Sequence, residues 1–362
     1  MTIAQQMDWE RPLVDPVRDS ELEALARRAL GLVPPYLPYL ASCPWLARMV
    51  LTGNHSAGVI AHLDDRFVEL VFMAVSQDNS CRYCYASQRA LLRLGGMSEE
   101  RIRQLEETSF NLDLTPEQKA GLEFARRVSR SDPPPTRADV DALRGAGYSD
   151  HEIKELAAFA VTALAGNRIT TLAAIPTRAT EQYADRLRNR LLRPFIGWNL
   201  RRLSKRGFNE PLAPEAQSGP WAYMVNAMAP LPFAHFFRRT LDDFWESPIL
   251  SRRLKGLVAA VVARGLGAER SEREARRLLE PEGLKREDLD EILAHLGSPV
   301  LDPLEAAALS FARDTIRSQG APLQRGARGV RDQLSAAQYL ELVGVAALSN
   351  AAARLDFIVD AD

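Results

Sequence analysis

The chain matches itself at a fixed offset of 187 positions, and this internal repeat restricts the fold more than any other feature. At that offset Gly96 falls on Gly283. After one residue is lost in a loop the offset becomes 186, and Arg168 falls on Arg354. Helical periodicity alone matches apolar residues by chance, but it does not match a glycine, helix caps and a register over about 100 residues. We therefore predict a tandem duplication.

The repeated unit has the sequence pattern of an all-α protein. Apolar residues recur at three and four positions, while β-branched alternation and Asn-Gly turns are scarce. Helix starts come in matching pairs, and each offers a cap and a side chain able to close a capping box. These starts are Thr115 to Gln118, Asp302 to Glu305, Ser149 to Glu152 and Ser335 to Gln338.

A length of 362 residues favours two domains. We place the first repeat at residues 1–178, a basic connector helix and linker at 179–220, and the second repeat at 221–362. The connector is rich in arginine between 186 and 206. It is interpreted as a connector with a solvated or inter-subunit face, in preference to a helix for anionic lipid or nucleic acid, because the net charge of -1 gives no support to such partners.

Composition further limits the partners. The net charge predicts no nucleic acid, and no uninterrupted apolar segment approaches the roughly 18 residues that a membrane span needs. We expect a cytoplasmic protein that is not exported. Its three cysteines are too few for a disulfide scaffold, and a structural zinc site needs about four ligands. We therefore expect no metal or cofactor, a redox use for Cys81 and Cys84, and a buried apolar role for Cys43.

The segment around Cys81 and Cys84 carries the strongest chemical signal. Asn79 or Ser80 can cap a helix that starts at Cys81. Unpaired N–H groups and the positive end of the helix dipole then favour a thiolate, and Arg82 adds to that field. The spacing of three residues places both sulfurs on one face, where they can form an intramolecular disulfide.

Glu69 lies twelve residues before Cys81, inside an apolar stretch. A carboxylate there is costly to bury without a partner, so it faces either a polar site or solvent. Glu69, Cys81 and Cys84, with the aromatic Tyr83 between the cysteines, resemble the core of the alkylhydroperoxidase AhpD and carboxymuconolactone decarboxylase superfamily. The family pattern has a helix Glu, twelve residues to a C-x-x-C pair, and a His four residues after the second Cys.

The resemblance covers residues 40–175 well and 235–360 in a weaker form. It implies an AhpD-like helical fold, with the two repeats packed as a pseudo-dimer, and a peroxiredoxin-type antioxidant enzyme. In that reading Cys84 attacks a small hydroperoxide, Cys81 resolves the product as a disulfide and Glu69 relays the proton. The resemblance also implies a lipoyl or thioredoxin-like dithiol protein as reductant, and a homo-oligomer.

The chain departs from the family pattern at Gln88, which stands where the family has His. An amide donates and accepts hydrogen bonds, but it is not a base near neutral pH. Gln88 lies over Cys84 on one helix face and can hold a water or the thiolate. Glu69 acting directly or through water is the favoured relay, with His62 or His55 as substitutes. Slow peroxidase turnover, or a thiol–disulfide role without peroxide, follows.

The second repeat keeps none of the chemical positions. Glu69, Cys81, Cys84 and Gln88 align with Gly256, Ala268, Ser271 and Ala275 respectively. An active-type repeat joined to a silent one also resembles the sestrins. Two further hypotheses therefore stand beside the peroxidase: a non-catalytic or redox-sensing protein for ligand binding or assembly, and a weaker one, a cofactor-free decarboxylase-like enzyme.

Overall fold

The computed structural model describes residues 11–53, 60–94, 96–107, 114–177, 218–229, 231–317 and 321–359. These residues contain α-helices and no β-strand, which confirms the all-α prediction. The first half contains α1 (Ser20–Leu30), α2 (Leu37–Leu40), α3 (Pro44–Gly53), α4 (Asp65–Asp78), α5 (Arg82–Leu94), α6 (Glu99–Glu107), α7 (Pro116–Arg130), α8 (Arg137–Gly145) and α9 (Asp150–Leu172). The second contains α13 (Ala222–Ala227), α14 (Pro232–Glu246), α15 (Arg252–Leu266), α16 (Glu269–Leu279), the 3-10 turn η3 (Glu280–Glu282), α17 (Arg286–His295), α18 (Pro303–Arg317), α19 (Ala321–Arg331) and α20 (Ala336–Val359).

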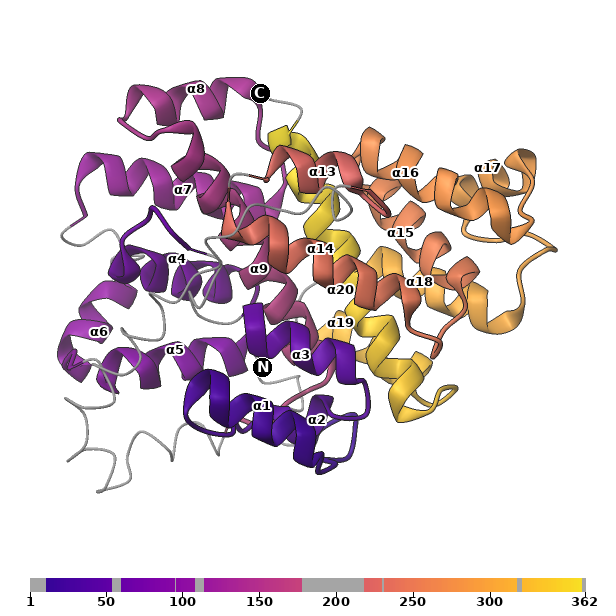
Figure 1. Cartoon of the computed structure of the whole chain (residues 1–362), viewed down its shortest axis with the longest axis horizontal. Helices are drawn as coiled ribbons and strands as arrows, with labels where there is room; N and C mark the ends of the chain where they lie inside the picture. The colour runs from indigo at the N-terminus through magenta and orange to yellow at the C-terminus, as the bar shows by residue number, and fades with distance from the viewer. Residues whose placement is uncertain are drawn as a thin grey trace.

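The helices of the two halves follow one another in the same order. The first residues of α4, α5, α6 and α7 stand 187 positions before those of α15, α16, α17 and α18, and α9 begins 186 positions before α20. In Figure 1, α4 to α8 lie on one side, α15 to α18 lie on the other, and α9 and α20 run between them. This arrangement follows the repeat register, and the duplication itself stays a prediction.

The predicted helix starts are confirmed by their hydrogen bonds. Reciprocal capping boxes begin α7 at Thr115 and Gln118 and begin α9 at Ser149 and Glu152. The corresponding starts of α18 and α20 show the same exchange. The backbone N–H of each cap residue donates to a side chain three residues on, and the side-chain oxygen of the cap residue accepts from the backbone N–H of that later residue. Local chain chemistry thus sets where the long helices begin.

The centre of the molecule is the pair formed by α9 and α20, which pack against each other along their length. Both are buried on nearly all sides, so neither has a continuous polar face. Within the described residues, α20 alone is long and apolar enough to cross a membrane, and 89% of its apolar window is buried inside the structure. Gly344 permits close packing, because a Cβ there would lie 2.7 Å from Trp45 of α3.

One continuous apolar core contains residues of both halves. Its members include Leu22, Val75 and Leu156 from the first half and Val262, Phe311 and Leu348 from the second. The predicted connector lies almost entirely outside the described residues, because residues 178–217 are not among them. The domain boundaries at 178 and 221 therefore stay predictions.

Candidate functional site

The two site cysteines lie at the start of α5, where the chain turns back from α4. α4 ends at Asp78 with Asn79 as its C-cap, and Ser80 adopts a left-handed conformation with φ 53°. The predicted cap at Asn79 or Ser80 is therefore wrong by one or two residues. The cap is Cys81 itself, because its Sγ accepts a hydrogen bond of 3.2 Å from the backbone N–H of Cys84.

This geometry has an electrostatic consequence. An N-cap side chain accepts from an N–H that has no partner inside the helix, and the positive end of the helix dipole adds to that field. The N–H groups and the helix dipole stabilise a sulfur in the cap position most strongly when it is a thiolate. In the structure Cys81 and Cys84 form a disulfide, and their Cα atoms are 5.5 Å apart.

Thr170, from the last turns of α9, contacts both sulfurs. Its Oγ1 lies 3.1 Å from the Sγ of Cys81 and 3.1 Å from the Sγ of Cys84. The same hydroxyl donates to the carbonyl of Gly166, one turn earlier, at 2.9 Å. When the disulfide is reduced, this hydroxyl can turn its hydrogen toward a thiolate at either cysteine.

The sulfur pair is enclosed by apolar and aromatic groups. Cys81 is 1% exposed and Cys84 is 5% exposed. Tyr83 lies between the two cysteines in the sequence and is buried. Its ring packs edge-on against the ring of Tyr36, with 6.3 Å between the ring centroids. Cys84 is thus the more exposed of two buried cysteines, and Arg82 is exposed in the same turn.

Glu69 and Gln88 lie on the two helices of the same hairpin. Glu69 is half-buried on α4, nine residues before its end, which is about 13 Å from the turn. Gln88 is 2% exposed on α5, six residues after its start, at about 9 Å. Because the helices are antiparallel neighbours, Gln88 lies at a level between Cys84 and Glu69. The hairpin therefore carries the cysteines, the amide and the carboxylate on two neighbouring helices.

His62 lies away from the sulfurs. Asp64 caps α4 and starts the helix at Asp65, so His62 precedes the helix and does not share a face with Glu69. Its ring stacks on His151 at 5.5 Å, in the first turn of α9. Thr170 follows nineteen residues later on that helix, about 28 Å along its axis. His55, the other histidine considered, lies outside the described residues.

The corresponding place in the second half holds a different polar group. Tyr223, Ser271 and Asp356 occupy the positions that match Tyr36, Cys84 and Thr170 in the repeat register. The Tyr223 hydroxyl donates to Asp356 at 2.8 Å and lies 3.1 Å from the Ser271 hydroxyl. Asp356 also accepts from the Ser271 backbone N–H at 2.8 Å. A buried hydrogen-bond network has thus taken the place of the sulfur pair.

The position matching Glu69 is closed by packing. A Cβ on Gly256 would lie 2.7 Å from Cδ2 of Leu279, so the Leu279 side chain would have to move before a longer side chain could fit. Ala268 and Ala275 are buried as well. The second half thus lacks the redox residues at the aligned positions, as predicted, and packed side chains fill the corresponding space.

Thr170 is the site residue that sequence reasoning missed. It is a polar residue in a long, buried and mostly apolar helix, as are its neighbours Asn167 and Arg168. The unusual number of polar side chains in this stretch is a signal that could have pointed to a site. Nothing in the sequence says that the stretch meets the cysteines, 86 residues earlier.

Residues 46–127 match the family model described as the carboxymuconolactone decarboxylase family. The matched segment contains Glu69, both site cysteines and Gln88, and it ends before α9. No curated protein matches the chain.

Proposed function

We propose that this chain, whose residues 46–127 match the carboxymuconolactone decarboxylase family, is a thiol-dependent oxidoreductase that reduces a small hydroperoxide through Cys81 and Cys84. The observation that carries the proposal is the Thr170 hydroxyl at 3.1 Å from both sulfurs of a C-x-x-C disulfide. A hydroxyl at this place can turn its hydrogen toward a thiolate at either sulfur, and the thiolate is the reactive form of cysteine.

The first step uses the reduced protein. The Cys84 thiolate attacks the outer oxygen of the hydroperoxide and breaks its O–O bond. Cys84 becomes a sulfenic acid, and the alkoxide takes a proton and leaves as the alcohol. Cys84 is assigned this role because it is the more exposed sulfur and matches the attacking cysteine of the family. A small hydroperoxide is the fitting substrate for a sulfur that is only 5% exposed.

The second step closes the disulfide. The Cys81 thiolate attacks the sulfur of the sulfenic acid, the S–S bond forms, and hydroxide leaves as water after protonation. The N–H of Cys84 and the hydroxyl of Thr170 both favour the anionic form of Cys81. The same stabilisation makes Cys81 the better leaving group when the disulfide is later reduced.

The cycle ends when a dithiol reductant attacks Cys84 and expels the Cys81 thiolate. A second thiol of the reductant then releases it as its own disulfide, so both cysteines return to the reduced form. We propose a lipoyl or thioredoxin-like protein for this role, as the family resemblance implies. The carrier must present its sulfur on a narrow group, because the site sulfurs are almost enclosed.

This site lacks an efficient group for delivering a proton to the alkoxide. Gln88 occupies the expected position of a base and is buried, but an amide does not titrate near neutral pH. We assign the relay to Glu69, acting through water along the hairpin. Turnover is then slower than with a histidine at position 88.

The test is peroxide consumption with dihydrolipoamide as the reductant. We expect Cys84→Ser to abolish consumption, and Cys81→Ser to stop after one equivalent with a sulfenic acid that dimedone captures at Cys84. Cys43→Ser serves as the control, because Cys43 is the free, buried cysteine. Equal consumption by the wild type and Cys84→Ser would show that the proposal is wrong.

A redox-sensing role is the second candidate, and the buried Gln88 favours it because the site then lacks a fast relay. In that case neither the wild type nor Gln88→His consumes peroxide catalytically, while stoichiometric oxidation of the pair still occurs. Assembly into a homo-oligomer and a cytoplasmic location stay predictions.

A further inference from the structure

A cavity of about 230 Å³ lies between the two halves, where α7 and α9 meet α18 and α20. Four arginines line it, and one carboxylate, Asp132. The arginines form two pairs in the repeat register: Arg130 with Arg317, and Arg168 with Arg354. We call this place the arginine pocket.

Two of the arginines are buried at the base of the pocket. Arg168 is 3% exposed and Arg354 is 1% exposed. Arg354 donates to Oδ1 of Asn350, on the same helix, at 2.6 Å. Arg354 also donates to the carbonyls of Ser129 at 2.9 Å and Ile316 at 3.0 Å, and Arg168 donates to the Ile316 carbonyl at 3.3 Å. These carbonyls belong to the last turns of α7 and α18, so the arginines tie the ends of the two halves together.

The oxygens that accept from Arg354 are backbone and amide carbonyl oxygens, which carry only partial negative charge. Burial, followed by the nearby charges of Arg168 and Arg317, holds the pKa of Arg354 well below its ordinary value. Burial also lowers the pKa of Arg168 to about 10. The pocket thus has an excess of positive charge in a place that is poorly solvated, where an anion is strongly favoured.

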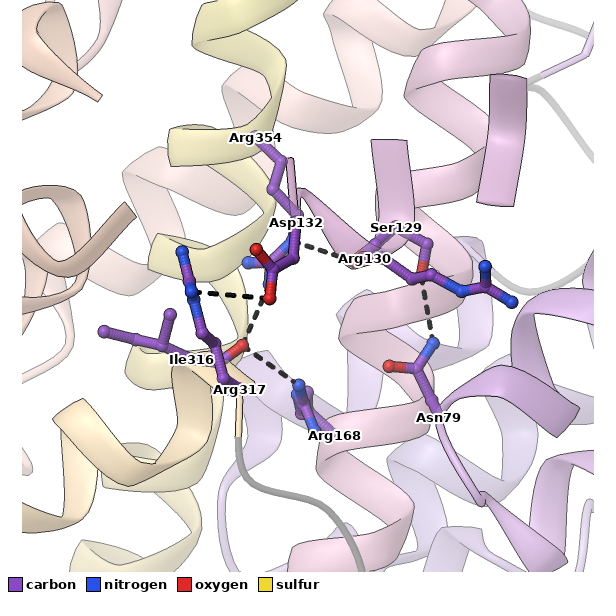
Figure 2. A pocket seen from close by; sticks show the side chains of 8 residues that line it. All are labelled: Asn79, Ser129, Arg130, Asp132, Arg168, Ile316, Arg317 and Arg354. Carbon is purple, nitrogen blue, oxygen red and sulfur yellow. Dashed lines mark hydrogen bonds and ion pairs between the residues drawn. The ribbon is translucent and has the colours of Figure 1, made fainter. Parts of the chain in front are cut away.

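The other two arginines connect the pocket to solvent. Arg317 has a side chain that is 55% exposed and pairs with Asp132 at 3.4 Å, whose own side chain is 64% exposed. Figure 2 shows Arg317, Arg354 and Asp132 close together with Arg168 beside them, while Arg130 extends away from this group. Arg130 pairs at 2.8 Å with Asp78. One exposed carboxylate, paired with Arg317, thus lies in a pocket that Arg168 and Arg354 also line.

We propose that the arginine pocket binds a compact oxyanion with two negative charges, held by Arg317 and the buried arginines. A guanidinium presents its N–H groups as a fork that matches the oxygens of a phosphate or carboxylate. The pocket is smaller than the 300 to 1,000 Å³ or so of drug-sized ligand sites, so it suits a single phosphate group or a short dicarboxylate. The Asp132 carboxylate already pairs with Arg317, so it competes with a bound anion.

The experiment titrates the oxidised full-length protein with inorganic phosphate, and in a second arm with malonate, by calorimetry at constant ionic strength set with chloride. We expect saturable binding of one anion per chain in at least one arm, and the tighter arm identifies the oxyanion class. Arg317→Gln should weaken that binding at least about tenfold, because a charge-assisted contact is lost. Asp132→Asn should tighten it about fivefold, because a competing charge is removed.

Arg313→Gln is the matched control, because Arg313 lies on the same helix with a 56% exposed side chain, pairs with Asp314 and does not line the pocket. It should leave the affinity unchanged. The proposal is overturned if neither anion binds, or if Arg317→Gln and Arg313→Gln weaken binding equally. The gain in Asp132→Asn distinguishes an anion site from a structural role, because loss of an ion pair alone would not increase affinity. Binding is measured without turnover, so the result is independent of the proposed redox activity.

Discussion

The hydroxyl oxygen of Thr170 lies 3.1 Å from the sulfur of Cys84, and this contact joins residues 86 positions apart. The central helix of the fold thereby takes part in the chemistry of the C-x-x-C hairpin. The hydrogen bond to Gly166 holds the hydroxyl oxygen beside the sulfurs before a thiolate forms. Donation to a thiolate then requires that the single hydroxyl hydrogen turn away from the Gly166 carbonyl.

Replacement of Thr170 by Val should make the reduced cysteines less acidic. The change keeps the shape of the side chain and removes one hydrogen bond to a charged sulfur, which is worth about 1.5 to 3 kcal/mol. The pKa of the more acidic cysteine should rise by about one to two. The rate of iodoacetamide alkylation against pH measures this change. Thr162→Val is the control, because Thr162 lies on the same helix and donates only to Ala158 among the bonds described.

Replacement of Gln88 by His should accelerate peroxide consumption. An imidazole one turn after Cys84 adds a group that can move a proton near neutral pH, and such catalysis is worth on the order of a hundredfold. Gln88→Met has a similar length without a base and should show no gain. Initial rates at saturating reductant measure the effect, and equal rates in His and Met variants would contradict the assigned role of this position.

Cys43 should make the stability of the protein fall at alkaline pH. Burial raises the pKa of its thiol from 9.0 to about 12. Between these values the unfolded chain loses the proton and the folded protein keeps it, so the free energy of unfolding decreases as pH rises. Cys43→Ala should be less stable than the wild type at pH 7, and the difference should narrow by about 2 kcal/mol by pH 10.5. The measurement is urea unfolding without reductant, which keeps Cys81 and Cys84 oxidised. A difference in free energy of unfolding between the wild type and Cys43→Ala that does not change with pH would contradict the prediction.

Gly256→Glu should not recreate the first-half site in the second half. The new side chain would collide with Leu279 and place a carboxylate in an apolar interior. We expect the free energy of unfolding to drop by about 3 kcal/mol or more. Gly329→Glu is the matched control, because a Cβ at this exposed helical glycine meets nothing within 4 Å and glycine is a poor helix former. Denaturation midpoints of both variants decide the prediction.

Local signals predicted the parts of the fold that depend on neighbouring residues. The capping boxes at Thr115 and Ser149 needed only four residues each, so their positions were correct. The cap predicted at Asn79 or Ser80 comes too early in the sequence, because thiols rarely serve as caps and the left-handed conformation of Ser80 has no sequence signal; the observed cap is Cys81.

Long-range contacts could not be predicted in the same way. The sequence offers His62 as a substitute for the Glu69 relay, but Asp64 starts the helix of Glu69 after His62, and Glu155 accepts a hydrogen bond of 2.8 Å from the backbone N–H of His62. Thr170 and the arginine pocket depend on how α9 and α20 pack, and no local periodicity contains that information. The chemistry of the hairpin was readable from spacing, whereas its surroundings were not.

The shared position of α9 and α20 determines how the protein can be divided. Each helix buries most of its surface, and much of that surface faces the other half. A fragment that ended before residue 218 would leave one side of α9 in water, and the complementary fragment would do the same to α20. Neither fragment is therefore expected to be soluble alone. Produced together they should recognise each other and reassemble, so the chain is suited to a split reporter whose signal depends on fragment complementation.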